Sequence, residues 1–150
     1  MSALHVGDEA PDFALPAEYG TTVRLSDFRD KQPVVLIFYP MDQTPGCTAQ
    51  LCAARDDAER YNAAGVAVFG VNNGSAASHR RFSERYKFRT PLLVDNGLHV
   101  ADAYDAAVGF GPLRMIKRTV VGISAEGKVV YYRRGAPATD EILSALSAPA

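Results

Sequence analysis

The sequence predicts a single α/β domain over residues 1–150, with a mixed central sheet, helices on both faces and a short β extension at the N-terminus. Three observations predict this class. Short apolar runs rich in β-branched and aromatic residues recur along the chain, as is typical of strands buried inside a sheet. Stretches with helical character separate these runs. The last two runs flank a Gly-containing turn, which indicates an antiparallel hairpin and therefore a mixed sheet.

Five runs are predicted as strands of the central sheet: residues 34–39, 66–71, 92–94, 119–123 and 128–132. The first two runs are continuous, which fits strands that are covered on both faces. The last two runs flank Ser-Ala-Glu-Gly, a sequence suited to a hairpin turn. Residues before the first of these strands form the predicted extension, with short strands around 13–15 and 23–25.

Helices are predicted between the strands. Residues 48–63 are rich in alanine and contain neither Gly nor Pro, and Gly65 follows as a C-cap. In residues 75–86, Phe82 and Tyr86 lie four positions apart and therefore share one face of a helix.

A final helix is predicted through Leu146, with Thr139 or Asp140 as its N-cap and with Ile142 and Leu143 beside Leu146 on its inner face. The predicted order of the core is thus strand, helix, strand, helix, strand, hairpin, helix. This order fits helices packed on both faces of a sheet.

Composition excludes several classes of protein. A chain of 150 residues can bury roughly 68–70% of its unfolded surface and needs neither disulfides nor a metal to hold a core. A net charge of -1 argues against a broad basic surface for nucleic acid or anionic membrane. No apolar segment approaches the roughly 20 residues of a membrane span, and no secretory signal is expected. We therefore expect a cytoplasmic protein, where the two cysteines are more often reactive than structural.

The most informative segment is Tyr-Pro-Met-Asp-Gln-Thr-Pro-Gly-Cys-Thr, at residues 39–48. It follows a buried strand and opens a helix, so Cys47 is expected in the first helical turn. Free N–H groups and the positive end of the helix dipole favour the thiolate there, and the thiolate is the nucleophilic form. Pro45 fixes the backbone before the cysteine, Gly46 allows close approach of a substrate, and Thr44 supplies a hydroxyl.

Cys52 lies in the same predicted helix as Cys47. Five helical residues place two Cα atoms roughly 8.7 Å apart, whereas a disulfide needs about 4.4–6.8 Å. A bond between the two cysteines therefore requires the helix to unwind. The spacing suits neither a zinc site nor a C-x-x-C redox motif. On spacing alone, Cys52 is either an inert core residue or a partner of Cys47, and Cys47 itself could be a small buried hydrophobe.

The segment Pro40-x-x-x-Thr44-x-x-Cys47 resembles the active-site motif of the peroxiredoxins. With Cys52 five residues later, it is similar to the branch of the bacterioferritin comigratory protein and peroxiredoxin Q. The resemblance covers nearly the whole chain, through the stretches 7–13, 34–39, 70–72, 78–79, 91–95 and 118–119. It implies a thioredoxin-like fold, in agreement with the predicted order of strands and helices.

The resemblance also implies site roles. Cys47 corresponds to the peroxidatic cysteine and Cys52 to the resolving cysteine, which makes the chain an atypical two-cysteine enzyme. Pro40 would shield the thiolate, Thr44 would bond the peroxide, and Arg118 would lie beside the cysteine. Without the resemblance, nothing in the sequence distinguishes Arg118 from the other arginines near it.

Three positions depart from the family pattern: Gln50, Val120 and Ser124 replace a common Glu, an aromatic residue and an Asp. They leave the chemistry in place but affect local packing and the choice of peroxide.

The implied function is a peroxidase that reduces hydrogen peroxide and organic hydroperoxides through a Cys47 sulfenic acid and a Cys47–Cys52 disulfide. The expected reductant is thioredoxin or a similar dithiol protein, with no cofactor or metal, and the expected state is a monomer or a weak dimer. Two alternatives stay open: a peroxide sensor or regulatory thiol protein, and a non-catalytic thioredoxin-fold module. Peroxide turnover separates the sensor from the peroxidase, and a thiol titration identifies inert cysteines.

Two further features have no assigned chemistry. His79 lies on a predicted helix beside Arg80 and Arg81, where a surface or packing role is expected rather than catalysis. Residues 110–113, Phe-Gly-Pro-Leu, are expected to form a loop that either walls a peroxide pocket or is a surface turn.

Overall fold

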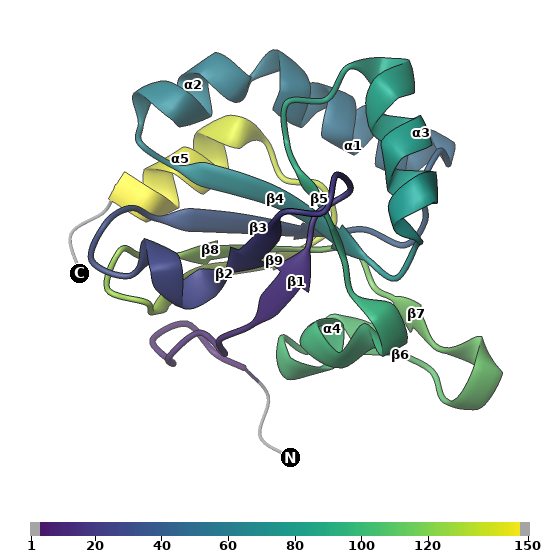
Figure 1. The fold of residues 1–150 in the computed structure, drawn as a ribbon. Coiled ribbons are helices and arrows are strands. Elements are labelled where there is room, and N and C mark those ends of the chain that lie inside the picture. The colour runs from purple at the N-terminus through teal and green to yellow at the C-terminus, as the bar shows by residue number, and fades with distance from the viewer. Residues whose placement is uncertain (1–3, 148–150) are drawn as a thin grey trace.

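A computed structural model describes residues 4–147 of the chain. Its centre is a five-stranded sheet in the order β5-β4-β3-β8-β9 (Figure 1). The strands are β3 (Val34–Phe38), β4 (Ala67–Asn72), β5 (Leu92–Val94), β8 (Thr119–Ile123) and β9 (Val129–Arg134). Strands β3, β4 and β5 are parallel, whereas β8 runs antiparallel to β3 and pairs with β9 as a hairpin. The predicted mixed sheet is confirmed.

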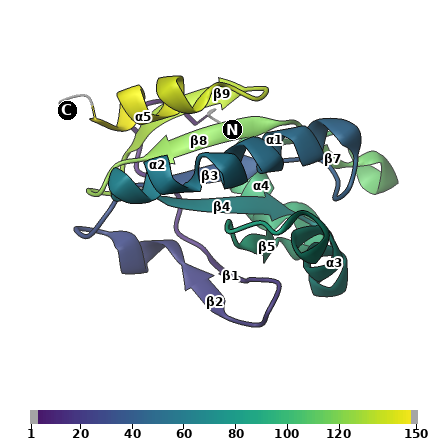
Figure 2. The same cartoon turned by 90° about the horizontal axis from the view of Figure 1, so that it is seen from above.

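Helices lie on both faces of the sheet, as predicted (Figures 1 and 2). One face carries four helices: α1 (Pro45–Asp56), α2 (Ala58–Ala63), α3 (Ala76–Tyr86) and α5 (Thr139–Ser147). The other face is covered by one short helix, α4 (His99–Ala103), and by the N-terminal extension. Within residues 4–147, no helix is both long enough and apolar enough to cross a bilayer.

Strand β3 is buried along its full length because it is the middle strand of a sheet that is covered on both sides. Side chains alternate between the two faces of a strand. Val35 and Ile37 accordingly join the core beneath α1, whereas Leu36 and Phe38 join the core against α4. Tyr39 follows on the α1 side and is fully buried. The strand thus delivers the next residues of the chain to the edge where α1 begins.

The predicted helix over residues 48–63 is wrong in two respects. The helix begins earlier, with Pro45 in its first turn, and it is interrupted at Asp57, which separates α1 from α2. Aspartate favours caps over helix interiors, and the Asp57 carboxylate accepts a hydrogen bond from the Thr139 hydroxyl at the start of α5 (2.5 Å). Gly65 follows α2 with a φ of 72°, so its predicted role at the helix end is confirmed.

The N-terminal extension is confirmed as a hairpin of β1 (Ala14–Pro16) and β2 (Thr22–Arg24), followed by a 3₁₀ turn at Leu25–Phe28. The last helix is confirmed as well, but it begins at Thr139, so this residue lies inside the helix rather than capping it. Ile142 of α5 is buried, and Leu143 and Leu146 pack against the same core.

Helix α4 was not predicted. It has five residues, and the buried Asp95 accepts hydrogen bonds from the backbone N–H groups of Val100 and Ala101 at its start. A 3₁₀ turn (Asn96–Leu98) precedes it. The small strand pair β6 (Ala107–Val108) and β7 (Met115–Ile116) also went unpredicted. Both elements are too short to leave a periodic pattern in the sequence.

Candidate active site

Cys47 lies in the first turn of α1, as the sequence predicts. The chain leaves β3 after Phe38, crosses the sheet edge in residues 39–44 and enters α1 at Pro45. The Cys47 side chain is 1% exposed and packs into the core on the α1 face. Its position at the helix start places the sulfur near backbone N–H groups that have no partner inside the helix. Negative charge that develops at this sulfur during a reaction would be stabilised by the start of the helix.

Arg118 comes from the connection between β7 and β8, yet it reaches Cys47. Its Nη2 donates a hydrogen bond to Cys47 Sγ at 3.2 Å, and its Nη1 donates to Gln50 Oε1 at 2.6 Å. Gly46 makes room for this approach, because a Cβ there would lie 3.1 Å from Arg118 Nη2. The close approach that the sequence assigned to a substrate is thus made by an arginine.

Thr44 and Pro40 lie in the same loop. The Thr44 hydroxyl donates to the Met41 carbonyl oxygen at 3.0 Å, which closes a turn just before α1. Pro40 follows the buried Tyr39 and is half-buried. The structure therefore brings Arg118 to Cys47 at one end of the sheet, with Thr44 and Pro40 in the loop before α1. The Thr44 hydroxyl is bonded to Met41 and not to Cys47 or Arg118.

Cys52 occupies the same helix as Cys47, and both thiols are free. Its side chain is half-buried. Because α1 is continuous from Pro45 to Asp56, the helical spacing keeps the two cysteines too far apart for a disulfide. No group of three His, Cys, Asp or Glu side chains within residues 4–147 is arranged to hold a metal ion.

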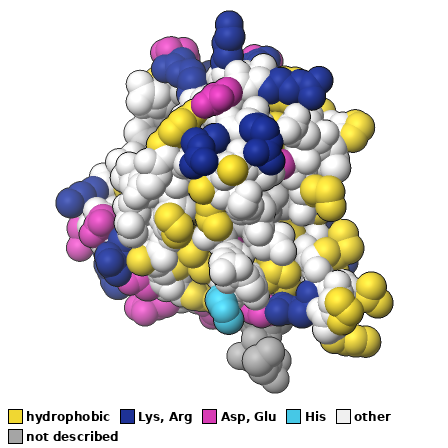
Figure 3. Space-filling model, turned by 45° about the vertical axis from the view of Figure 1, so that its right-hand side comes forward, with side chains coloured by type: hydrophobic (Ala, Val, Ile, Leu, Met, Phe, Trp, Pro, Cys, Tyr) yellow, Lys and Arg dark blue, Asp and Glu magenta, His cyan; other side chains and the backbone are white. Residues whose placement is uncertain are grey.

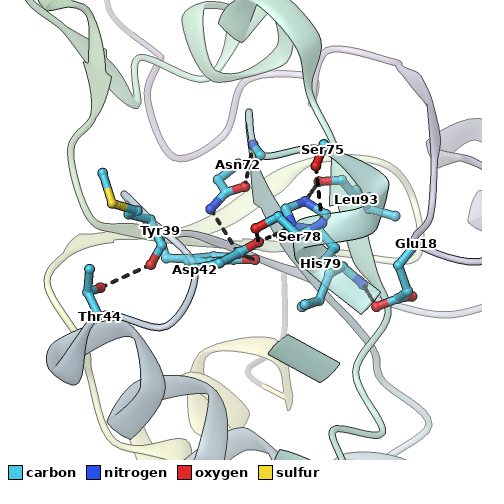
Figure 4. Close-up of polar contacts among 12 residues, drawn as sticks. Glu18, Tyr39, Asp42, Thr44, Asn72, Ser75, Ser78, His79 and Leu93 are labelled. Carbon is cyan, nitrogen blue, oxygen red and sulfur yellow. Dashed lines mark hydrogen bonds and ion pairs between the residues drawn. The ribbon is translucent and has the colours of Figure 1, made fainter. Parts of the chain in front are cut away.

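Asp42 forms a polar network that sequence reasoning missed (Figure 4). One carboxylate oxygen accepts from Tyr39 Oη at 2.7 Å and from Asn72 Nδ2 at 3.2 Å. The other accepts from Ser78 Oγ at 2.7 Å and lies 2.6 Å from His79 Nδ1. The four partners come from the end of β3, the end of β4 and helix α3.

The prediction for His79 is half right. A catalytic label was correctly set aside in favour of packing, but a surface position is wrong because the side chain is 0% exposed. Its Nε2 lies 3.0 Å from the Leu93 carbonyl oxygen, which can only accept a hydrogen bond. The only earlier signal was that Asp42 and the Ser78–His79 pair both fall within stretches that carry the family resemblance.

The projecting segment around residues 110–113 is a surface turn. It contains a 3₁₀ turn at Gly111–Leu113 between β6 and β7. Phe110 is 84% exposed and Leu113 76%, and Figure 3 shows hydrophobic side chains gathered at this end of the molecule.

The AhpC/TSA family model matches residues 6–132. The chain belongs to the AhpC/TSA family. Peroxiredoxin Bcp from Bacillus subtilis is 35% identical over 147 residues, which cover 95% of this chain and 93% of the relative. The chloroplastic peroxiredoxin Q of Triticum aestivum is 50% identical over 91 residues, and the match spans 61% of this chain but only 42% of the plant protein. The predicted peroxiredoxin branch is confirmed.

Solved structures agree with this assignment. Peroxidoxin BcpB from Mycobacterium tuberculosis superposes with a TM-score of 0.88 at 32% identity, covering 95% of this chain and 96% of that one. The bacterioferritin comigratory protein of Xanthomonas campestris, described for alkyl peroxide reduction activity, has a TM-score of 0.83 at 27% identity, with 97% of each chain covered. The thioredoxin-like fold of this peroxiredoxin is therefore confirmed.

Burial and hydrogen bonding set the ionisation of the Asp42 network in this peroxiredoxin. Burial alone would raise the pKa of Asp42. Hydrogen bonds from His79, Tyr39 and Ser78, together with the electrostatic effect of His79, outweigh burial, so the pKa lies below its ordinary value. Burial, together with the Asp42 carboxylate, raises the pKa of Tyr39 well above its ordinary value. Asp42 is therefore an ionised acceptor and Tyr39 a neutral donor at neutral pH.

The lowered pKa of Asp42 predicts how stability depends on pH. Its contribution is complete above the ordinary value of 3.8 and is lost as the pH falls through the lower folded value. We expect Asp42→Asn to cost about 3 kcal/mol at neutral pH, because it removes the charge of a buried carboxylate that is hydrogen-bonded to four groups. The stability difference between wild type and variant should shrink at pH values below the folded pKa. Urea unfolding across this range measures the difference; a constant gap would contradict the assignment.

Gln50 is the second side chain that Arg118 bonds, and changing it tests how the charge of Arg118 affects Cys47. A neutral amide leaves the charge of the guanidinium free to act on Cys47. We expect Gln50→Glu to slow oxidation of Cys47 by peroxide about fivefold, corresponding to about 1 kcal/mol, because the new carboxylate pairs with Arg118. Stopped-flow measurement of the first oxidation step tests this. Gln50→Met, which has similar size and no charge, is the control; an equal slowing in both variants would exclude a charge effect.

Proposed function

We propose that the chain is a thiol peroxidase that reduces hydrogen peroxide and alkyl hydroperoxides at Cys47. The observation that carries this proposal is the 3.2 Å hydrogen bond from Arg118 to Cys47 Sγ at the start of α1. A cationic donor and a helix N-terminus then act on the same sulfur. The activity described for the related Xanthomonas campestris protein supports an alkyl peroxide as one substrate.

In the first step, the Cys47 thiolate attacks one peroxide oxygen. An S–O bond forms and the O–O bond breaks, and the departing oxygen takes up a proton and leaves as water or alcohol. Sulfur is oxidised to a sulfenic acid. Arg118, the Thr44 hydroxyl and the backbone N–H groups at the start of α1 would stabilise the charge that spreads over the two oxygens. Pro40 would limit access of water to the thiolate.

In the second step, Cys52 attacks the sulfenic sulfur. An S–S bond forms, the S–O bond breaks, and water leaves. The first turns of α1 must unwind beforehand, because the two cysteines lie five residues apart in one helix. A dithiol protein such as thioredoxin would then supply two electrons to reduce the disulfide. This sequence is that of an atypical two-cysteine peroxidase.

The remaining parts of the proposal concern the setting of the enzyme. We propose a monomer that functions in the cytoplasm. The resemblance to its branch supports the monomer, and the two free cysteines fit a reducing compartment. The plant relatives, of which the chain spans less than half, are chloroplastic. The contact between Arg118 and Cys47 favours a reactive thiol over an inert module. A sensor would share this oxidation but would turn over slowly with a reductant.

Replacing Cys52 tests this proposal. We expect Cys52→Ala to consume one equivalent of peroxide at nearly the wild-type rate and then stop when thioredoxin is the only reductant. The wild type should instead lose both thiols and gain an intramolecular disulfide. Mass spectrometry, with a 1,3-diketone to trap the sulfenic acid, distinguishes these products. Continued turnover of the variant with thioredoxin would contradict the role of Cys52, and an unoxidised Cys47 would contradict the function.

A further inference from the structure

The Asp42 network ties the loop that carries the active site to the rest of the fold. The Asp42 side chain is 5% exposed, and its two oxygens meet four hydrogen-bonding groups. Four contacts fill the acceptor capacity of a carboxylate. Figure 4 shows these groups converging on Asp42 from β3, β4 and α3. Asp42 is therefore the most firmly held residue of the loop.

A glycine at position 74 leaves room for the Asp42 network. Gly74 lies beside it, and a Cβ at this position would lie 3.1 Å from Asn72 Oδ1 and His79 Cε1 and 3.2 Å from Asp42 Oδ2. The Gly74 backbone N–H also donates to Asn72 Oδ1 at 2.8 Å, which turns the Asn72 amide nitrogen toward Asp42. Glu18 is also buried, which raises its pKa, and its carboxylate accepts a hydrogen bond from Leu92 N at 3.0 Å.

A short, well-defined path connects Asp42 to Cys47. The Thr44 hydroxyl bonds back to Met41, and the Thr48 N–H donates to the Thr44 carbonyl oxygen at 2.8 Å, which closes the first turn of α1. Cys47 lies inside this turn. A displacement of Asp42 therefore shifts the start of α1 and the sulfur with it.

Two features between Asp42 and the first turn of α1 are unfavourable to the folded conformation. Gln43 has a φ of 63°, in the left-handed region that disfavours a residue with a side chain. The buried Thr48 hydroxyl has no hydrogen-bond partner among the described residues. On the far side, the fully buried Leu51 fixes the next turn of the helix. The left-handed backbone at Gln43 and the Thr48 hydroxyl thus both lie between Asp42 and Leu51.

We propose that Asp42 and His79 are positioning residues that hold the first turn of α1 folded for peroxide attack and set how readily it unwinds for disulfide formation. This inference rests on the proposed function. Asp42 marks the N-terminal boundary of the segment that unwinds, and its bonds to α3 oppose the strain at Gln43. Weakening the network moves the two steps in opposite directions: oxidation of Cys47 slows because its position is less well held, and formation of the disulfide accelerates because unwinding is easier.

Three variants weaken the network by degrees: Ser78→Ala removes one bond, His79→Gln removes the imidazole, and Asp42→Asn removes the charge. For Asp42→Asn we expect Cys47 oxidation to slow about tenfold. At high peroxide, a second peroxide molecule can oxidise the sulfenic acid to a sulfinic acid before Cys52 reacts. Because the variant unwinds more easily, we expect its ratio of disulfide to sulfinic acid to rise about tenfold. The milder Ser78→Ala should change both by about twofold and stays informative if Asp42→Asn folds poorly. Rapid mixing gives the oxidation rate, and mass spectrometry gives the products.

A matched control separates positioning from general loss of stability. Tyr104 is fully buried on the opposite face of the sheet, and its hydroxyl donates to the Pro11 carbonyl oxygen at 2.5 Å. Tyr104→Phe therefore loses a hydrogen bond on the face of the sheet opposite α1, at an atom that contacts Pro11 rather than the loop. It should leave both rates and the product ratio at their wild-type values.

Hydrogen exchange at the Thr48 amide reports on the same turn without any chemistry. We expect exchange about tenfold faster in Asp42→Asn and unchanged in Tyr104→Phe, each relative to a core amide of β8. Opposite changes in the two rates, together with faster Thr48 exchange, support the inference. If the oxidation and disulfide rates of the variants stay unchanged or fall together, the inference is overturned. The proposed function still holds in that case, provided that the wild type turns over peroxide. A wild-type protein that leaves peroxide unconsumed overturns both.

Discussion

Cys47→Ser is expected to lower the rate of peroxide consumption by at least about a thousandfold. Serine has nearly the same shape, but its hydroxyl is not ionised near neutral pH and its oxygen cannot be oxidised to an equivalent of a sulfenic acid. The side chain is buried in the core of the α1 face, so the substitution preserves packing. Peroxide consumption with a dithiol reductant is the measurement, and near-wild-type consumption would overturn the assignment of Cys47.

The control for this substitution is Cys52→Ser, which changes the only other thiol in the chain. It should retain the first oxidation at close to the wild-type rate, so that the loss in Cys47→Ser cannot be attributed to the removal of any thiol. Unfolding in urea should show both variants to be folded. A Cys52→Ser protein that fails in the first step would mean that the two cysteines cannot be assigned separate roles.

Arg118→Ala is expected to slow oxidation of Cys47 about a hundredfold. Its Nη2 is the one charged donor described at the Cys47 sulfur, and removal of a single donor to developing charge costs about 10²–10³ in rate in other enzymes. The loss should appear in the first oxidation step, measured by rapid mixing. Arg118→Lys should recover part of the rate, because it restores the charge but not the forked geometry that bonds Cys47 and Gln50 together.

The matched control is Arg133→Ala. Arg133 lies on β9, and its guanidinium pairs with Glu141 at the surface. Exposed pairs of this kind contribute little, so this variant should keep the wild-type rate. An equal slowing in Arg118→Ala and Arg133→Ala would indicate a general effect of positive charge and would contradict a specific role for Arg118.

The central strands were predictable because their sequence pattern is dictated by burial. The run at residues 34–39 is apolar throughout, and only a strand covered on both faces has that pattern. The hairpin of β8 and β9 was marked by its turn. Helix α4 was not predicted, because its five residues are too few to show a helical period in the sequence.

In the active-site loop, too, some features were predictable from local sequence and others were not. The strand that ends at residue 38 and the helix that begins at Pro45 place Cys47 by local sequence alone. The predicted single helix was wrong at Asp57, where the backbone leaves the helical conformation (φ -95°, ψ 9°). Gly46 was correctly singled out for close approach, but its neighbour could not be named before the pairing of β8 with β3 brought Arg118 beside it.

The sequence by itself determined that Cys47 stands at a helix start and that an intact helix separates it from Cys52, because both facts follow from spacing along one segment. Only the tertiary structure decided which arginine reaches the sulfur and which residues hold the loop. Arg118 lies 71 positions from Cys47, and His79 lies 37 positions from Asp42. Contacts across such separations arise from the order of strands in the sheet. The local sequence around one residue therefore does not identify the residue that it contacts.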